Sequence, residues 1–187
     1  MTQMVDLDDG VMGFTHDWII ALSKHWPKTY VIAKHLGRHN LPDNVVPLSL
    51  GKESGRSRAA QALKLYHHLH AISSKHKMVF LIAHMCPIYA LLAAPFISNK
   101  FRIALWYSHA NLTSILTASL KICDVVFTSS PESFPLSSYK TRVMGHGVDT
   151  NRFSPSKDNT QKDDKRRFRL VSVGRLSPVK DYVTLIE

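Results

Sequence analysis

The chain alternates short apolar runs, rich in β-branched and aromatic residues, with longer stretches whose apolar positions recur at helical spacing. The clearest run is MVFLIA, Met78 to Ala83, which stops at His84. The pattern predicts further strands at 29–33, 45–50, 101–107, 124–128, 140–144 and 168–173, helices at 14–25, 56–75, 88–97 and 112–123, and helices that start at 129 and 179. Such alternation predicts an α/β fold with a mainly parallel sheet, because parallel neighbours require a crossover connection.

The first strand expected of such a fold is short in this chain. Thr2 to Val5 has the pattern of a strand end, followed by a loop at 6–13 and then a helix. A doubly wound domain normally opens with a buried strand of about five residues. We therefore expect either a start that lies upstream or a truncation at this end. Gly10 and Gly13 would let a ligand approach the backbone at the helix start, and a plain turn explains them equally well.

The stretch 56–75 has an apolar stripe on one helical face and basic residues on the other. The predicted stripe consists of Ala59, Leu63, Tyr66, Leu69 and Ile72, and the basic face of Arg56, Arg58, Lys64, His67, His68 and His70. A helix of this kind either covers a sheet or lies on an anionic membrane surface, and both interpretations stay open.

Length and charge limit the classes of protein. With 187 residues and a formal net charge of +10, the chain fits one domain and part of another. Part of the charge lies in the run 157–169, which we interpret as a solvated linker; elsewhere aromatic and basic residues do not interleave, so no nucleic-acid partner is expected. Cys86 and Cys123 are interpreted as buried thiols, with no spacing typical of zinc.

The start of the chain lacks the pattern of a signal peptide, since its first residues are polar and acidic. The longest apolar run, 85–97, has about 13 residues, where a membrane span needs about 20. We therefore expect a cytoplasmic protein, and peripheral attachment to a membrane remains an alternative.

Four segments, each a short apolar run that stops at small, polar or charged residues, point to a family. They are FRIALWYSHA from 101, DVVFTSSPESF from 124, TRVMGHGVDTNRF from 141 and LVSVGRLSPVKD from 170. Their order and spacing resemble the family 4 retaining glycosyltransferases of the GT-B fold. The resemblance implies a Rossmann-like, doubly wound acceptor-side domain at 1–153, a linker at 154–167 and the truncated start of a donor-binding second domain at 168–187.

The last segment carries the most specific motif. Gly174 ends the predicted strand, and Arg175 and Lys180 follow it around the start of a helix. Helix-start amides favour anions, and the two cations add positive charge there. The resemblance implies that these residues bind the diphosphate of a nucleotide-sugar donor and stabilise the leaving group.

The resemblance also implies roles for residues at the ends of earlier strands. His109 matches a histidine near the sugar-binding site and is the candidate catalytic residue. The candidate cleft residues, in addition to Gly10 and Gly13, are His84, Ser129, Gly147 and Asp149. His146 stands where the family commonly has asparagine, which weakens an exact assignment of hydrogen bonds at that turn.

The expected function is transfer of a sugar from a nucleotide-sugar to an acceptor, with retention of configuration and with no metal or other cofactor. The acceptor could be lipid-linked, a glycan or a small molecule. The family's donor-site glutamate pair would lie beyond Glu187, so we expect this chain to be inactive as truncated. The alternative is a non-catalytic Rossmann-like module that binds anionic ligands or membrane surfaces.

Overall fold

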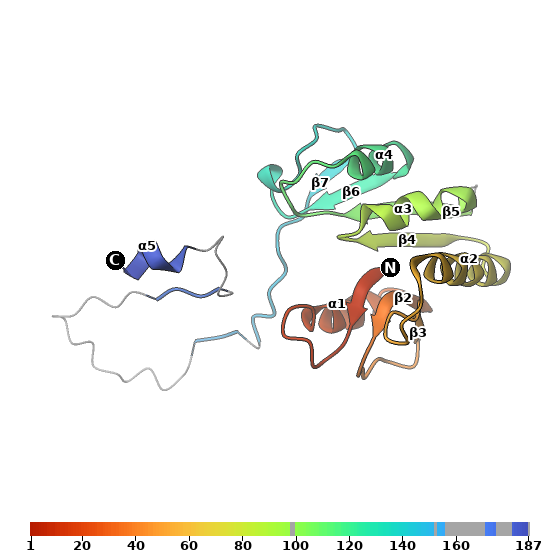
Figure 1. Cartoon of the computed structure of the whole chain (residues 1–187), viewed down its shortest axis with the longest axis horizontal. Coiled ribbons are helices and arrows are strands. Elements are labelled where there is room, and N and C mark those ends of the chain that lie inside the picture. Colours follow the sequence, from red (N-terminus) through yellow and green to blue (C-terminus); the bar gives the residue numbers. More distant parts are fainter. Residues whose placement is uncertain (98–99, 152, 156–170, 175–180, 187) are drawn as a thin grey trace. The chain divides into compact units, whose positions relative to one another are not determined.

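The structure, a computed structural model, describes residues 1–97, 100–151, 153–155, 171–174 and 181–186 (Figure 1). The chain divides into two units, Met1–His146 and Gly147–Glu187. The described part of the second unit contains one short helix, α5 (Tyr182–Ile186), and the other described elements belong to the first unit.

The first unit contains two parallel sheets. One has three strands in the order β1-β2-β3, and the other has four in the order β4-β5-β6-β7. The strands are β1 (Thr2–Val5), β2 (Thr29–Leu36), β3 (Val45–Ser49), β4 (Val79–His84), β5 (Phe101–Trp106), β6 (Val125–Thr128) and β7 (Thr141–Val143). The predicted α/β class with parallel strands and a Rossmann-like character is therefore confirmed.

Met1 joins the two sheets. Its nitrogen donates a hydrogen bond to the carbonyl of Ile82 at 2.6 Å, and the backbone N–H of His84 donates to the carbonyl of Met1 at 2.8 Å. This pair of bonds is the pattern of a parallel ladder, so β1 lies between β2 and β4 (Figure 1). The strand order is thus β3-β2-β1-β4-β5-β6-β7, and it changes direction between β1 and β4, where ligands bind in open α/β sheets.

Side-chain caps and prolines set several helix starts. The described helices of this unit are α1 (Phe14–Ser23), α2 (Arg58–Lys75), α3 (Pro87–Ala93) and α4 (Ser114–Ile122), with 3₁₀ turns η1 (Ala94–Phe96) and η2 (Pro131–Ser133). The hydroxyl of Ser57 accepts from the Ala60 N–H ahead of α2, and that of Thr113 accepts from the Leu116 N–H in α4. Pro87 opens α3, because proline lacks the N–H that the first turn leaves unpaired.

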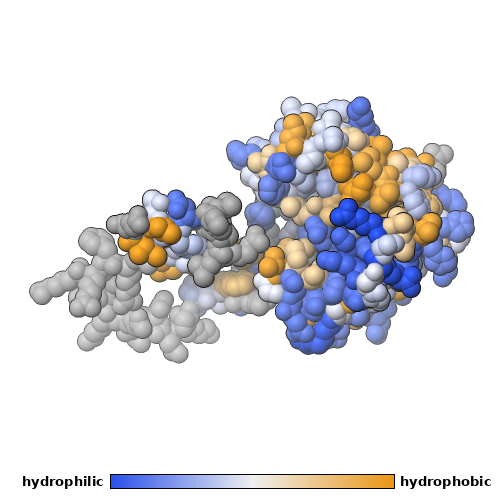
Figure 2. All heavy atoms as spheres, in the orientation of Figure 1, coloured by the Kyte–Doolittle hydropathy of each residue, from blue (hydrophilic) through white to orange (hydrophobic). Residues whose placement is uncertain are grey.

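The helices cover the two faces of the sheet unequally. The larger core cluster joins α2, α3 and α4 to inward residues such as Leu81, Ile103 and Leu105, whereas a smaller one joins Ile19 of α1 to β1, β2 and β3. Successive strand residues face opposite sides, and Val31 and Ile32 belong to different clusters, so α1 lies on the face opposite α2–α4. Figure 2 shows apolar side chains also gathered over α3 and α4, on the outer surface of the domain.

The structure corrects the predicted apolar stripe of α2. Leu63 is 72% exposed, whereas Leu65, which the prediction left out, is fully buried with Leu69 and Ile72. Positions 65, 69 and 72 follow the same helical spacing as the predicted stripe and share Leu69 and Ile72 with it. The helix has apolar residues at both 63 and 65, so the spacing alone allows either one. Packing against the sheet selects between two stripes that the sequence alone allows.

Other predicted elements are shorter than expected. The helix predicted at 88–97 ends as α3 at Ala93, and Pro95 lies in the 3₁₀ turn that follows. The helix predicted to start at 129 is the single turn η2. In the strand predicted at 168–173, residues 171–173 are not in a strand and 168–170 lie outside the described residues. Residue 179, where the final helix was predicted to start, also lies outside them, and the described helix is α5, Tyr182–Ile186.

Lys140, directly before β7, binds the carboxyl end of α4. Its Nζ donates to the carbonyls of Leu120, Lys121 and Cys123 at 3.0, 3.2 and 2.8 Å. These carbonyls lie at the helix end, where the helix dipole favours a cation. Lys140→Met should therefore lower the free energy of unfolding by about 1–2 kcal/mol in urea titrations. Lys121→Met, which removes an exposed lysine from the same helix end, is the control; equal losses in the two variants would contradict the capping role.

Candidate functional site

Hydroxyl groups gather where β5 and β6 end. The hydroxyls of Ser108 and Ser129 are hydrogen-bonded to each other, and Ser129 donates to the hydroxyl of Ser133 at 3.2 Å. Ser130 and Ser133 share a further hydrogen bond of 2.9 Å. Parallel strands end at the same edge of a sheet, so the residues after β4, β5 and β6 lie along one edge. Ser129, predicted from sequence as a cleft residue, lies in the middle of this serine cluster (Ser108, Ser129, Ser130 and Ser133).

His109 adjoins the serine cluster. Its backbone N–H donates to the carbonyl of Ser133 at 2.8 Å, and its Nδ1 accepts from the backbone N–H of Asn111 at 3.0 Å. Because Nδ1 accepts, the neutral ring carries its proton on Nε2. The imidazole is exposed, so Nε2–H can donate a hydrogen bond to an oxygen of a bound molecule. This arrangement favours a hydrogen-bond donor at this position over a general base.

His84 ends β4 among aromatic rings. Its ring lies 5.4 Å from that of Trp18 and 6.2 Å from that of Phe14, between centroids, and its Nδ1 lies 3.2 Å from the hydroxyl of Thr2. Burial, and secondarily the ammonium of Met1, lowers the pKa of His84 to about 4. His84 is therefore neutral at pH 7 and contributes hydrogen bonds and ring surface instead of charge.

The backbone turns sharply after His84. Met85 has a φ of 55°, in the left-handed region that costs a residue with a side chain about 1–2 kcal/mol. The backbone N–H of Ser108 donates to its Sδ at 3.3 Å, and its own N–H donates to the carbonyl of Trp106 at 2.8 Å. These contacts hold the loop after β4 against the end of β5 and thus beside the serine cluster.

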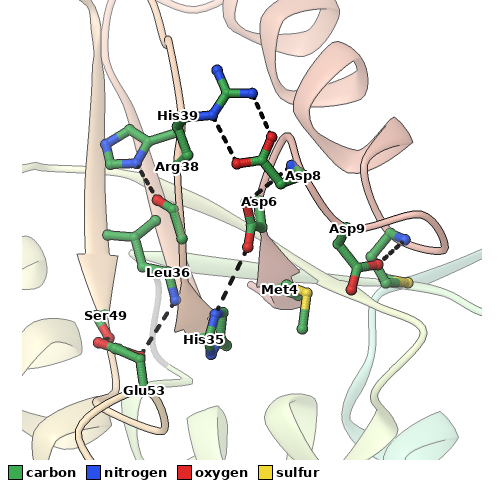
Figure 3. Close-up of polar contacts among 12 residues, drawn as sticks. Met4, Asp6, Asp8, Asp9, His35, Leu36, Arg38, His39, Ser49 and Glu53 are labelled. Atoms are coloured by element: carbon green, nitrogen blue, oxygen red, sulfur yellow. Dashed lines mark hydrogen bonds and ion pairs between the residues drawn. The ribbon is translucent and has the colours of Figure 1, made fainter.

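The loop after β1 carries three aspartates (Figure 3). Oδ1 of Asp9 accepts from the backbone N–H groups of Val11 and Met12 at 2.9 and 2.6 Å. A carboxylate thus occupies the amides that lead into α1, where the glycines had suggested the approach of a ligand. An anionic ligand at these amides would have to displace Asp9.

A second pair of contacts fixes the end of this loop against β2 (Figure 3). Arg38 donates two hydrogen bonds to the carboxylate of Asp8, and the hydrogen bond from Arg38 holds the pKa of Asp8 below its usual value. Asp6 directly follows β1, with its Oδ2 4.0 Å from Nε2 of His35. A Cβ at Gly37 would lie 2.2 Å from the same oxygen, so only glycine lets the Asp6 carboxylate approach the backbone this closely.

The two glycines of the loop differ in what surrounds them. A Cβ added to Gly13 would lie 2.8 Å from the carbonyl oxygen of Asp9, whereas one added to Gly10 would meet nothing within 4 Å. Gly13→Ala should therefore lower the free energy of unfolding by about 1–3 kcal/mol, while Gly10→Ala should be neutral or slightly stabilising. Thermal melts of the two variants provide the measurement; an equal effect would show that the loop adjusts freely at Gly13.

The remaining predicted residues lie in the second unit or outside the described part. Oδ1 of Asp149 accepts from the backbone N–H of Asn151 at 2.9 Å, which makes a local turn after Gly147. Gly174 is exposed, and Arg175 and Lys180 lie outside the described residues. The diphosphate site therefore stays a prediction, while His84, His109 and Ser129 are placed on the edge formed by β4, β5 and β6.

Sequence reasoning missed Ser108, Ser133 and Asp6. Ser108 and Asp6 directly follow β-rich runs, which is a signal that the strand pattern already contained. Ser133 had no such signal, because it reaches the serine cluster only through the single turn of η2.

Comparison of the chain with protein-family models, with curated proteins and with solved structures found no match. Among the described residues, no group of three or more His, Cys, Asp or Glu side chains is placed to hold a metal ion. A search of the same residues for a helix of membrane-spanning length and hydropathy found none. The strand ends described above carry neutral hydroxyls, two histidines and carboxylates, which are groups that bind polyols by hydrogen bonds.

Proposed function

We propose that the chain contains the acceptor-side domain of a retaining glycosyltransferase of family 4, with the GT-B architecture, and the beginning of its donor-binding domain. The parallel Rossmann-like sheet is compatible with this assignment, and four sequence segments in the family's order support it. The substrate would be a nucleotide-sugar, with no separate cofactor, and the acceptor remains open among lipid-linked molecules, glycans and small molecules.

The observation that carries the proposal is the meeting of His109 with the serine cluster at the end of β5 and β6. A sugar presents several hydroxyls that each donate and accept, and serine hydroxyls match this pattern. Nε2–H of His109 would donate to an oxygen of the sugar, and the neutral ring of His84 would line the same edge. Arg175 and Lys180, after Gly174, would bind the diphosphate as it leaves.

The sugar side of the proposal is tested by amide chemical shifts of the ¹⁵N-labelled protein titrated with monosaccharides and simple glycosides. Shifts should concentrate at Met85, Ser108, His109 and Ser133. Ser129→Ala should weaken the response by about tenfold, because a buried hydroxyl partner is lost, and Ser73→Ala on α2 is the control. Absence of shifts at this edge, at concentrations up to solubility, would count against the proposal.

The donor side is tested separately with nucleoside diphosphates and nucleotide-sugars. Amide shifts should appear between Gly174 and Lys180 and should disappear in Lys180→Ala. Lys157→Ala, in the charged run outside the motif, is the matched control. Equal losses in both variants would identify nonspecific attraction to positive charge instead of a diphosphate site.

The alternative, a module that binds anionic membranes, draws on the net charge of +10. The apolar stripe of α2, however, is buried: Leu65, Leu69 and Ile72 pack in the main core. Insertion of that face into a bilayer would require α2 to leave the sheet. Membrane binding would therefore depend on the basic outer face alone and should vanish at high salt.

A further inference from the structure

The segment between Glu53 and Asp124 carries cations but no carboxylates. It contains no aspartate or glutamate, whereas lysine or arginine occupies positions 56, 58, 64, 75, 77, 100, 102 and 121. The helices α2, α3 and α4 all belong to this segment, and they cover the same face of the sheet. This helical layer therefore has positive charge that no carboxylate of its own helices offsets.

Helix α3 is apolar on every side, although it lies in the outer layer. The run 87–97, which forms α3 and η1, contains no polar side chain apart from the hydroxyl of Tyr89. The inner side of α3 packs in the main core, and helical spacing places Ile88, Leu91 and Pro95 on the opposite side. Ile88 is 40% exposed. A helix that is apolar all round is normally buried all round, so the outer side of α3 requires a cover.

Helix α4 extends this apolar surface. The hydroxyl of Ser119 lies 2.8 Å from the carbonyl oxygen of Pro87 and 2.7 Å from that of Ile115, so the start of α3 lies beside α4. Ile115 is 42% exposed, and Leu112, just ahead of α4, is 55% exposed. We call Ile88, Leu112 and Ile115 the apolar patch; Figure 2 shows apolar side chains gathered over these two helices. Exposed apolar groups that lie together mark an interaction surface.

Cations lie on the helices at both sides of α3. Arg58 is exposed and Lys64 is half-buried on α2, and Lys121 is exposed in the last turn of α4. Figure 1 shows α3 between α2 and α4. Because the apolar stripe of α2 is buried in the core, α2 adds only charge to this surface, and the apolar contribution comes from α3 and α4.

We propose that the outer surface of α2, α3 and α4 binds an anionic phospholipid bilayer. The apolar patch enters the boundary between headgroups and acyl chains, while the lysines and arginines of the layer bind lipid phosphates. The inference needs neither a sugar nor a nucleotide, so it does not rest on the proposed transferase function.

The charge selects the occupant. A second copy of the chain, docked through the same surface, would bring like cations together, which is costly. A bilayer with anionic lipids offers negative charge around an apolar interior, which is complementary to an apolar patch between cationic helices.

Binding is measured by flotation of the protein with vesicles. The protein should bind vesicles made of equal parts of phosphatidylcholine and phosphatidylglycerol, should leave them at high salt, and should not bind vesicles of phosphatidylcholine alone. Failure to bind the anionic vesicles, or equal binding to both compositions, would overturn the proposal.

Two pairs of variants test the surface. Ile115→Ser should weaken binding to the anionic vesicles by about fivefold or more, whereas Leu22→Ser on α1, at a side chain that is 43% exposed, should not. Lys121→Glu should also weaken binding by about fivefold or more, whereas Lys24→Glu, at the carboxyl end of α1, should change it less. Equal losses within both pairs would show that the outer surface of α2, α3 and α4 is not the binding surface.

The unaltered protein provides a test that does not depend on how the variants fold. On small bicelles that contain both lipids, a nitroxide on the lipid headgroup should broaden the amide signals of α3 and α4 more than those of α1. Broadening centred on α1 would overturn the proposal. If sedimentation instead shows a dimer that Ile115→Ser dissociates, the apolar patch is a subunit interface and the proposal fails.

Discussion

Replacing His84 with glutamine should make the stability of the protein less sensitive to pH between about 4 and 6.5. Burial lowers the pKa of His84 to about 4 from an ordinary value of 6.5. The unfolded chain therefore binds a proton in this window that the folded protein does not, so the free energy of unfolding falls as the pH falls from 6.5 to 4. The shift corresponds to about 3 kcal/mol of lost stability, which His84→Gln should largely remove.

Urea titrations at pH 7, 5.5 and 4.5 measure the difference between the two proteins. Thr2→Val is the informative control, because it removes the hydroxyl near Nδ1 but keeps the histidine buried. Since burial is the larger cause of the low pKa, this variant should retain most of the pH dependence. If wild type and His84→Gln lose stability in parallel from pH 7 to 4.5, His84 is accessible to protons in the folded state.

Leu65→Ala should be among the most damaging single changes in the domain. Leu65 is fully buried in the main core, and truncation of such a leucine costs about 2–5 kcal/mol through lost burial and the cavity left behind. Leu63→Ala, two positions earlier in the same helix, should change stability by less than about 0.5 kcal/mol, because Leu63 is 72% exposed.

The pair is compared by urea unfolding at neutral pH. Both substitutions create the same residue in the middle of α2, so helix propensity cancels between them. The difference isolates burial against the sheet. If Leu63→Ala lowered the free energy of unfolding more than Leu65→Ala, the result would support the stripe predicted from the sequence and would contradict the burial of Leu65 against the sheet.

The sequence predicted the alternation of strands and helices well because each strand of this sheet is short, apolar and bounded by polar residues. The runs around Leu81 and Ile103 are buried on one or both faces, which removes the ambiguity between strand and surface helix. The stripe of α2 was predicted less well, since apolar residues occur all along this helix. Which of them face the sheet depends on tertiary packing, and no local pattern encodes that choice.

The candidate site was predicted in part for a similar reason. Strand ends are visible in the sequence, so His84, His109 and Ser129 could be named before their contacts were known. Ser133 reaches the serine cluster through a turn, and Asp9 covers the amides before α1 through its side chain. Both contacts depend on loop geometry.

The sheet has a seam where β1 meets β4. Both described backbone hydrogen bonds across it involve Met1, and the hydroxyl of Thr2 and Nδ1 of His84 add one side-chain contact. On one side, α1 and the first three strands share a small cluster of five buried residues; on the other, most of the large core holds β4 to β7 together. We therefore expect unfolding in stages, with subglobal opening of the amino-terminal part at a lower free energy than the rest. Native-state exchange should divide the protected amides into two groups along this seam.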